Sequence, residues 1–234
     1  TFSSTGTFSV IGQAYHETAT SVTLFFDASS DATLSIDNVK AYEISKQPNN
    51  NHAQIYSGRG LEFDGVSDSL TVPNAVVNGK DWRTGTIATW LYLESTPAAA
   101  DRIFSHYDDG NTRFYFAFTN TSKIRHQLGD EDSFTDANTS LNLKTWYRAV
   151  LTWNVDGTAN MYLNGVLDKA STGIDVSTLN SIGSNATAIG SHNGTSAFFD
   201  GKMSDFQMWN ATWTAADVEY DYLNPEQLAL NRGG

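Results

Sequence analysis

The chain has 234 residues, enough for one large β-domain with or without part of a second. Its 26 acidic and 14 basic residues give a net charge of −12, which argues against binding to the phosphate backbone of nucleic acids. The absence of cysteine excludes disulfides and thiolate metal sites, and no apolar run reaches the length of a membrane span. Charged residues make up only 17%, a balance typical of many strands joined by polar turns.

Residues 1–45 form the first region of the predicted fold. The pattern predicts three strands, at 2–11, 21–27 and 32–44, which carry too few apolar residues for a core of their own. The segment ATLSIDNVKAYEI, at 32–44, resembles the closing strand of jelly rolls of the carbohydrate-binding-module type. We therefore expect this region to be the end of a preceding β-sandwich module, and the chain to be part of a longer polypeptide.

The pattern of the remaining residues predicts one complete domain at 55–222. A linker at 46–54 precedes it and an extension at 223–234 follows it. Short runs of β-formers between Gly, Asn and Asp turns indicate an all-β fold, an antiparallel β-sandwich. Thr214 stands three residues before Asp217, which predicts a capping box and one short C-terminal helix. The predicted strands are 59–64, 68–72, 85–94, 102–107, 112–118, 122–128, 146–154, 158–163, 166–170, 186–190 and 200–209.

The stretch WYRAVLTWNVDGTANMYLNGVLD, residues 146–168, predicts three strands joined by tight turns at Asp156-Gly157 and Asn164-Gly165. Asp-Gly and Asn-Gly supply the positive φ angles that type I′ hairpin turns need at both central residues. In the first strand one parity is wholly apolar and the other is mixed, so one face is expected in the core and the other at least partly wet. We expect Trp153 to be buried and Arg148 to be exposed.

Four segments of this domain, taken in their order along the chain, are informative together. They are GLEFDGVSDSLTVP (60–73), GTIATWLYLES (85–95), the hairpin stretch 146–168, and AIGSHNGTSAFFDGKMSDFQMWNATWTAADV (188–218). Together they resemble laminin G-like, concanavalin A-type jelly rolls. The resemblance implies two curved antiparallel sheets that are used mainly to bind sugars or proteins, frequently with calcium.

Five residues at outward parities are candidates for ligand binding. Aromatic faces can stack on pyranose rings, and arginines can bond hydroxyls or carboxylates, so the two types together suit a sugar site. The alternative is an ordinary cross-strand pattern that shields a sheet face. Trp146 opens its strand, and in the resembled family this position packs at a sheet edge, so it is left out of the site. The candidates are Tyr92, Arg113, Tyr115, Arg125 and Arg148.

Catalytic patterns are not found in the sequence, which predicts that the chain is not an enzyme. Glycan hydrolysis of the retaining type needs two carboxylates about 5–5.5 Å apart. The one dense acidic stretch, GDEDSFTD at 129–136, is polar throughout and predicts a solvated loop. GSHNG, at 190–194, has its serine in the wrong position for a nucleophile elbow, and no HExxH motif occurs.

Calcium is the expected structural cofactor, and two places could hold it. The resemblance implies an ion site formed by the FDG turn and the last strand, which here points to Asp64 and Asp205. Independently, HYDDGN places Asp108, Asp109 and Asn111 in one tight turn, with oxygen ligands of the kind that calcium prefers. Acidic turns also occur without any metal, so both sites are hypotheses.

The function predicted from these features is a non-catalytic structural and adhesion module of an extracellular or virion surface protein, with glycan binding as a further expectation. The ending YLNPEQLALNRGG (222–234) resembles the segment that comes after such domains in structural proteins of bacteriophages. Expected partners are a glycan or cell-surface polysaccharide and neighbouring virion or surface proteins, with a homo-oligomer left open. The first alternative is a secreted bacterial module that tethers an enzyme to polysaccharide, and the second is a divergent glycan hydrolase.

Overall fold

A computed structural model of the chain describes residues 54–56, 60–98, 100–109, 112–130, 134–180, 182–183 and 187–225, including all their side chains except those of 54–56, 74–75 and 107–109. The chain divides into two units, Thr1–Lys46 and Gln47–Gly234. All described residues belong to the second unit, so the predicted strands of residues 1–45 lie outside them.

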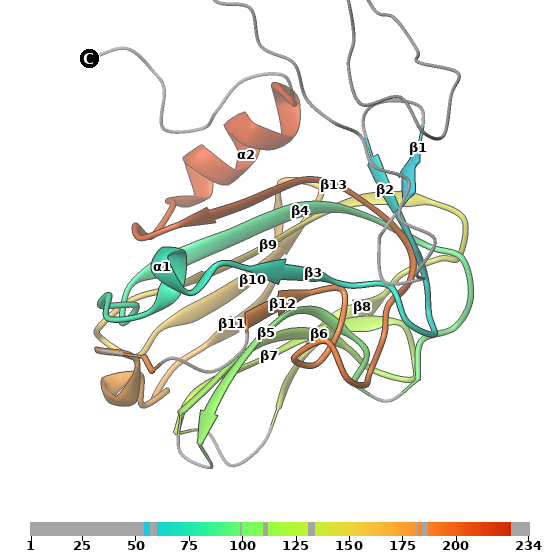
Figure 1. Cartoon of the computed structure of the whole chain (residues 1–234). Coiled ribbons are helices and arrows are strands. Elements are labelled where there is room, and N and C mark those ends of the chain that lie inside the picture. The colour runs from blue at the N-terminus through green and yellow to red at the C-terminus, as the bar shows by residue number, and fades with distance from the viewer. Residues whose placement is uncertain are drawn as a thin grey trace, which may run out of the picture. The chain divides into compact units, whose positions relative to one another are not determined.

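Two antiparallel sheets face each other and form the predicted β-sandwich (Figure 1). The seven-stranded sheet has the order β1 (Gln54–Tyr56), β2 (Gly60–Asp64), β13 (Asp200–Trp209), β4 (Gly85–Leu93), β9 (Trp146–Trp153), β10 (Ala159–Leu163) and β11 (Val166–Ser171). The six-stranded sheet has the order β3 (Leu70–Val72), β12 (Thr187–Ile189), β5 (Arg102–Asp109), β6 (Thr112–Phe118), β7 (Lys123–Gly129) and β8 (Thr135–Ser140). The helices are α1 (Asn74–Val77), the 3₁₀-helix η1 (Ser177–Asn180) and α2 (Ala215–Leu223).

The core between the sheets is built from the apolar parity of each strand. In β9 these are the residues predicted to face inward, and Trp153 is fully buried there, as predicted. Its ring meets Phe114 of the opposite sheet edge to face, with centroids 5.0 Å apart, and its Nε1–H donates to the Trp82 carbonyl at 2.7 Å. A side chain at Gly85 would place Cβ only 2.3 Å from this indole ring, so the glycine makes room for it.

The two hairpin turns differ from each other. Asn164 and Gly165 both have positive φ, 51° and 82°, as the predicted type I′ turn requires. In the other loop only Gly157 has positive φ, and its N–H donates to the Asn154 carbonyl at 3.0 Å. The predicted type I′ turn at Asp156-Gly157 is therefore wrong, because five residues connect the strands and need only one left-handed position.

Strand β8 corrects the prediction that residues 129–136 are all loop, because Thr135 and Asp136 are its first residues. Its sequence, TDANTS, is polar and carries no strand pattern. β8 lies at the edge of the six-stranded sheet, where polar side chains face water and discourage further pairing. The Asp168 carboxylate of β11 accepts the backbone N–H of Asn138 at 2.6 Å, which ties this edge to the other sheet.

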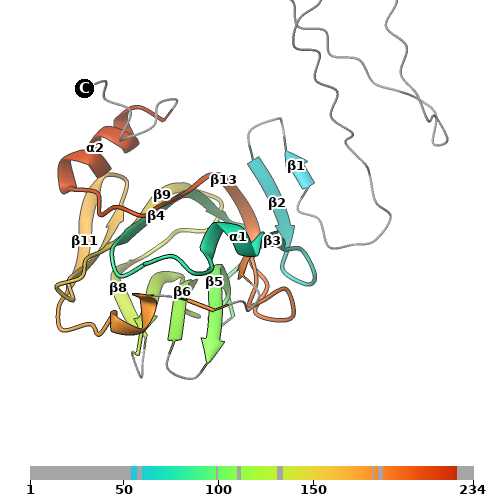
Figure 2. The same cartoon turned by 60° about the vertical axis from the view of Figure 1, so that its left-hand side comes forward.

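Helix α2 covers part of the outer face of the seven-stranded sheet, on the side away from the six-stranded sheet (Figures 1 and 2). The predicted capping box is present: Thr214 Oγ1 accepts the Asp217 N–H, and Asp217 accepts the Thr214 N–H. A second apolar cluster lies outside the main core, with Val218 of α2 and Trp213 packed with Ala88 and Val150 of the sheet. Within the described residues, no helix is long and apolar enough to cross a membrane.

Candidate functional site

The five predicted ligand residues lie on two opposite surfaces of the sandwich. Tyr92 and Arg148 come from β4 and β9 of the seven-stranded sheet, whereas the other three come from β6 and β7 of the six-stranded sheet. All five side chains point away from the core, as predicted. The outer faces of the two sheets, however, point in opposite directions. The structure therefore does not bring them into one site.

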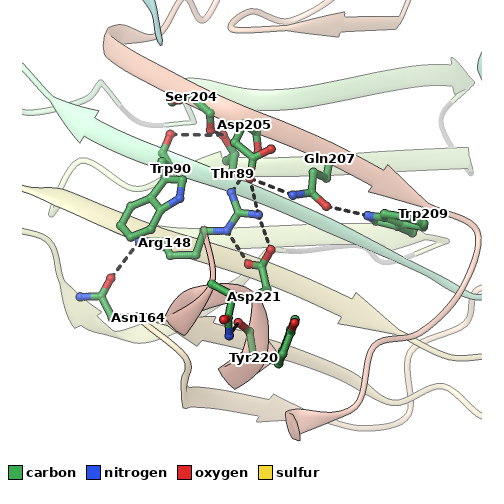
Figure 3. Close-up of polar contacts among 11 residues, drawn as sticks. Thr89, Trp90, Arg148, Asn164, Ser204, Asp205, Gln207, Trp209, Tyr220 and Asp221 are labelled. Carbon is green, nitrogen blue, oxygen red and sulfur yellow. Dashed lines mark hydrogen bonds and ion pairs between the residues drawn. The ribbon is translucent and has the colours of Figure 1, made fainter. Parts of the chain in front are cut away.

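Arg148 is not exposed, and the prediction that it lies on a wet face is wrong. Its side chain is 0% exposed because α2 covers this part of the sheet. Arg148 Nε donates to Asp221 Oδ2 at 2.6 Å, and Nη2 donates to Asp221 Oδ1 at 2.9 Å (Figure 3). Such a two-pronged contact between guanidinium and carboxylate is geometrically specific. Arg148 holds α2 on the sheet and is unavailable to a ligand.

Asp205 completes this buried network. It occupies a bulge of β13, where two residues stand opposite Thr89, and its φ of 48° is left-handed. The bulge turns its carbonyl and carboxylate toward Arg148, at 2.9 and 3.0 Å (Figure 3). The carboxylate also accepts from Gln207 Nε2 at 2.8 Å. Asp205 therefore serves the arginine, although its side chain is 35% exposed.

The two carboxylates predicted to share calcium are far apart along β13. Asp64 pairs with Asp200, whereas Asp205 lies five residues further along the strand. Asp64 Oδ1 accepts the N–H groups of Val66, Ser67 and Asp68 at 2.8, 2.8 and 3.0 Å. Burial raises the pKa of the Asp64 carboxyl, but these hydrogen bonds outweigh it and the net pKa is lowered. Asp64 thus closes its own turn, and the pair forms no common site.

The alternative calcium residues cannot be placed. The side chains of Asp108 and Asp109, and all of Asn111, lie outside the described part of the chain. Among the residues that are described, no group of three or more His, Asp or Glu side chains is arranged to hold a metal ion. Calcium binding stays a prediction.

An aromatic pair, the exposed Trp146 and the half-buried Tyr92, lies on the seven-stranded sheet beyond the part that α2 covers. The rings of Tyr92 and Trp146 have centroids 5.4 Å apart, and Trp146 is 41% exposed. Lys202 Nζ lies 4.6 Å from the Tyr92 ring centroid and also pairs with Glu62 at 3.8 Å and Glu94 at 3.5 Å. We define these five residues as the Tyr92–Trp146 platform. Trp146 was left out of the predicted site because this position was expected to pack at a sheet edge, whereas it stands on β9, between β4 and β10.

The outer face of the six-stranded sheet carries a more buried group. Tyr115 is only 4% exposed, because the Phe134 ring stacks on it with centroids 6.2 Å apart and the Arg102 guanidinium lies 4.3 Å from its centroid. Arg125 lies over the other ring, 4.5 Å from the Phe134 centroid. His192 Nε2 is 3.3 Å from the Tyr115 hydroxyl. We define these five residues as the Arg102–Phe134 cluster.

The remaining predicted residues take different places around this cluster. Arg125 pairs with the carboxylate of Asp136 at 2.7 Å, a partner on the unpredicted strand β8. Arg113 is half-buried and has the same outward parity as Tyr115, but it stands near the beginning of β6, opposite Gly129. The structure thus brings Tyr115 and Arg125 together through Phe134, which the sequence did not single out.

Arg102 was missed for a reason that lies in the backbone. Simple alternation places it on the same face as Phe104, which points into the core. A bulge between these two residues gives β5 one extra position, so Phe104 pairs with Phe116 while Arg102 pairs with Ala117. A one-residue slip moves a side chain to the opposite face. Arg102 therefore points outward.

Two curved antiparallel sheets with this strand order define the class of jelly-roll β-sandwiches. The family model described as the concanavalin A-like lectin/glucanases superfamily, of the laminin G type, matches residues 64–219. The chain belongs to this superfamily. No curated protein sequence matches it.

Solved structures support the same fold at low sequence identity. The native heptameric SAP-like pentraxin of Limulus polyphemus is 18% identical, with a TM-score of 0.56 over 70% of this chain and 81% of that one. Domain 4 of AbnA, an extracellular arabinanase of Geobacillus stearothermophilus in complex with arabinotriose, is 14% identical, with a TM-score of 0.56 over 70% and 76%. Trypanosoma rangeli sialidase in complex with sialic acid is 16% identical, with a TM-score of 0.57 over 76% of this chain but 30% of the enzyme.

Proposed function

We propose that this chain is a non-catalytic module of a larger surface protein and that it binds a glycan through the Tyr92–Trp146 platform. The observation that carries the proposal is the exposure of Trp146 beside the ring of Tyr92 on a sheet surface. Trp146 is the first residue of β9, and a large apolar side chain that is partly exposed loses part of the stabilisation that burial would give it. What distinguishes Trp146 from other exposed apolar residues is the adjacent Tyr92 ring with charged side chains beside it, since contiguous apolar surface with a polar rim is typical of binding sites.

The chemistry of the platform suits a pyranose ring. Tyr92 and Trp146 offer tilted aromatic faces, with an interplanar angle of 49°, for the C–H face of a sugar. Glu62, Glu94 and Lys202 stand beside them with charged atoms that can bond hydroxyl groups. The side chains project from paired strands, so little ordering entropy is lost when a ligand binds.

The solved relatives agree with this class of ligand. By their descriptions, the arabinanase domain holds arabinotriose and the sialidase holds sialic acid. These ligands belong to those proteins. The match covers 76% of the arabinanase domain, which supports a glycan as the class of ligand, but only 30% of the sialidase, so sialic acid carries no argument for this chain.

The proposal is tested by screening the full chain on a glycan array and measuring affinities for the best ligands. Trp146→Ala should weaken binding at least tenfold, since central aromatic contacts contribute about 2 kcal/mol or more. Val155→Ala is the matched control, because Val155 is also an exposed apolar residue but lies beyond the opposite end of β9. Equal affinities for the wild type and Trp146→Ala, with both variants folded, would remove the platform as the binding site.

Hydrolysis is the second candidate function, favoured by the two glutamates of the platform. Glu62 and Glu94 lie 3.8 and 3.5 Å from Lys202 Nζ, close to the aromatic pair, and glycoside hydrolysis generally uses two carboxylates. We expect no reducing ends from β-glucans, agarose or carrageenan. Turnover that survives purification and disappears in Glu62→Gln or Glu94→Gln would establish hydrolysis instead.

The surroundings of the protein form a separate part of the proposal. We favour a virion appendage or another extracellular surface, and the runner-up is a secreted bacterial module that tethers an enzyme to polysaccharide. Genes for tails and capsids beside this gene would support the first, and genes for polysaccharide degradation would support the second.

A further inference from the structure

Arg102 of the Arg102–Phe134 cluster is a buried cation without a carboxylate partner among the described residues. Arg102 is only 7% exposed, and its Nη1 donates to the Ala100 carbonyl at 2.8 Å. Its Nε is buried and has no hydrogen-bond partner, and no carboxylate in the described part of the chain forms an ion pair with it. Buried charges in proteins are usually paired, because burial without a partner is costly.

A second guanidinium points to the same place. Ala117 pairs with Arg102 on one side and with Arg125 on the other, so the two arginines stand on either side of an alanine on three adjacent strands. At the usual strand spacing their Cα atoms are about 9–10 Å apart. The Phe134 ring lies between them, with its centroid 5.1 Å from the Arg102 guanidinium and 4.5 Å from the other.

Four basic residues share this outer face, Arg102, Arg113, Lys123 and Arg125, and Asp136 pairs with the last of them. Arg113 and Lys123 share the outward parity of the two arginines, and the chain as a whole carries a net charge of −12. Burial is the main cause that lowers the pKa of Arg102. Tyr115 opposes this shift, the charge of Arg125 adds to it, and the charge of Asp101 opposes it with the smallest effect. The aromatic rings of the cluster offset part of this cost by cation–π contact, but they supply no formal negative charge.

We propose that the Arg102–Phe134 cluster is a second binding site, which takes the carboxylate of an acidic sugar. The carboxylate accepts from Arg102 Nε and from the adjacent edge of that guanidinium, while Arg125 stays paired with Asp136 on the other side of Phe134. The ring of Phe134 is partly exposed and turns away from Tyr115 as the ligand enters, which leaves an aromatic face for the sugar ring. A sugar is favoured over a peptide carboxylate because stacking faces lie beside the cations.

This site is independent of the Tyr92–Trp146 platform, which lies on the other sheet. Failure of Trp146→Ala to affect binding therefore says nothing against the cluster. Conversely, a variant of Arg102 should leave the binding of a neutral glycan to the platform unchanged.

The test is a titration of the full chain with sodium D-galacturonate, followed by NMR at the Arg102 Nε–H group. A saturable shift is expected, and the neutral methyl ester should bind at least tenfold more weakly. Arg102→Met should abolish the saturable response in the remaining signals of the cluster while its melting temperature stays the same or rises. Arg83→Met is the control, since Arg83 already has Asp81 at 2.6 Å and is exposed.

Several results would overturn the inference. Equal responses to galacturonate and its methyl ester would show that the carboxylate is not recognised. An equal affinity for acetate would leave a simple carboxylate, as on a peptide, as the better ligand. A large loss of stability in both Arg102→Met and Arg102→Lys would assign Arg102 to cross-strand packing alone.

Discussion

Two outward-facing arginines of this sandwich are buried in opposite ways. Arg148, on the seven-stranded sheet, lies under α2 and meets the carboxylates of Asp221 and Asp205 at 2.6 and 3.0 Å. Arg102, on the six-stranded sheet, lies against two aromatic rings and has no carboxylate partner among the described residues. Both guanidiniums are more than nine-tenths buried.

The difference separates a structural arginine from a candidate binding residue. Removing a charge from water costs several kcal/mol unless a partner with good geometry compensates for it. Around Arg148 the fold supplies that partner from a helix and a bulge, so the pair is complete without a ligand. Around Arg102 the compensation is partial, and an anion from outside would complete it.

The largest expected effect comes from breaking the complete pair. Arg148→Met leaves Asp221 buried without its cation, and loss of one partner of a buried pair costs about 3–5 kcal/mol. Urea unfolding of the full chain measures this as a lower midpoint with an unchanged slope. The double variant Arg148→Met/Asp221→Leu should recover most of the loss, because apolar replacement of both partners is often neutral. A loss below 1 kcal/mol in the single variant would mean that α2 does not depend on the pair.

The sequence predicted that Arg148 points away from the core, but not that α2 covers it. Alternation along β9 assigned Trp153 to the core and Arg148 to the outer face, and both directions are confirmed. The capping box at Thr214 also located α2 correctly. Nothing in these local patterns shows on which surface the helix packs, since that depends on contacts between residues 73 positions apart, such as Arg148 and Asp221.

A smaller effect is expected from the start of the helix that covers Arg148. Thr214→Ala removes the side chain that accepts the Asp217 N–H at 3.2 Å, and loss of such a cap costs about 1 kcal/mol. Because α2 supplies Asp221, amide exchange should also accelerate in β9 around Arg148. Thr96→Ala is the control, since Thr96 is an exposed loop threonine outside the helix. A Thr214→Ala variant with wild-type stability would show that α2 is held by packing alone.

Asp205 tests whether its carboxylate serves the arginine or calcium. Asp205→Asn weakens a partly exposed ion pair, so the expected loss is about 1 kcal/mol or less. The difference in melting temperature between wild type and variant should be the same in calcium and in chelator. A stabilisation by calcium that the wild type shows and Asp205→Asn lacks would restore the calcium site at this residue.

Less of the second surface could be predicted from the sequence, for two physical reasons. Strand β8, which supplies Asp136 to Arg125, is a polar edge strand without alternation. Arg102 reaches the outer face through a bulge, and alternation predicts the opposite face for it. Both features depend on how neighbouring strands pair, which a pattern within one strand does not contain.

The smallest expected effect is a change in the titration of His192, which senses the charge of Arg102. Burial lowers the pKa of His192 below 6.5, and the neighbouring Arg102 charge lowers it further. Arg102→Met should therefore raise this pKa while leaving it under 6.5, and Arg83→Met should not change it.

The sign of the effect on stability is set by the same shift. A histidine whose pKa is lowered by folding binds fewer protons in the folded state, so the folded state loses stability as the pH falls from about 6.5 through the folded pKa. This acid loss should be smaller in Arg102→Met. NMR titration of the His192 ring measures the pKa directly, and saturating galacturonate should raise it in the wild type by bringing a negative charge to the cluster. An unchanged His192 pKa in Arg102→Met would show that the charge of Arg102 does not affect His192. The difference between the paired Arg148 and Arg102 would then rest on their geometry alone.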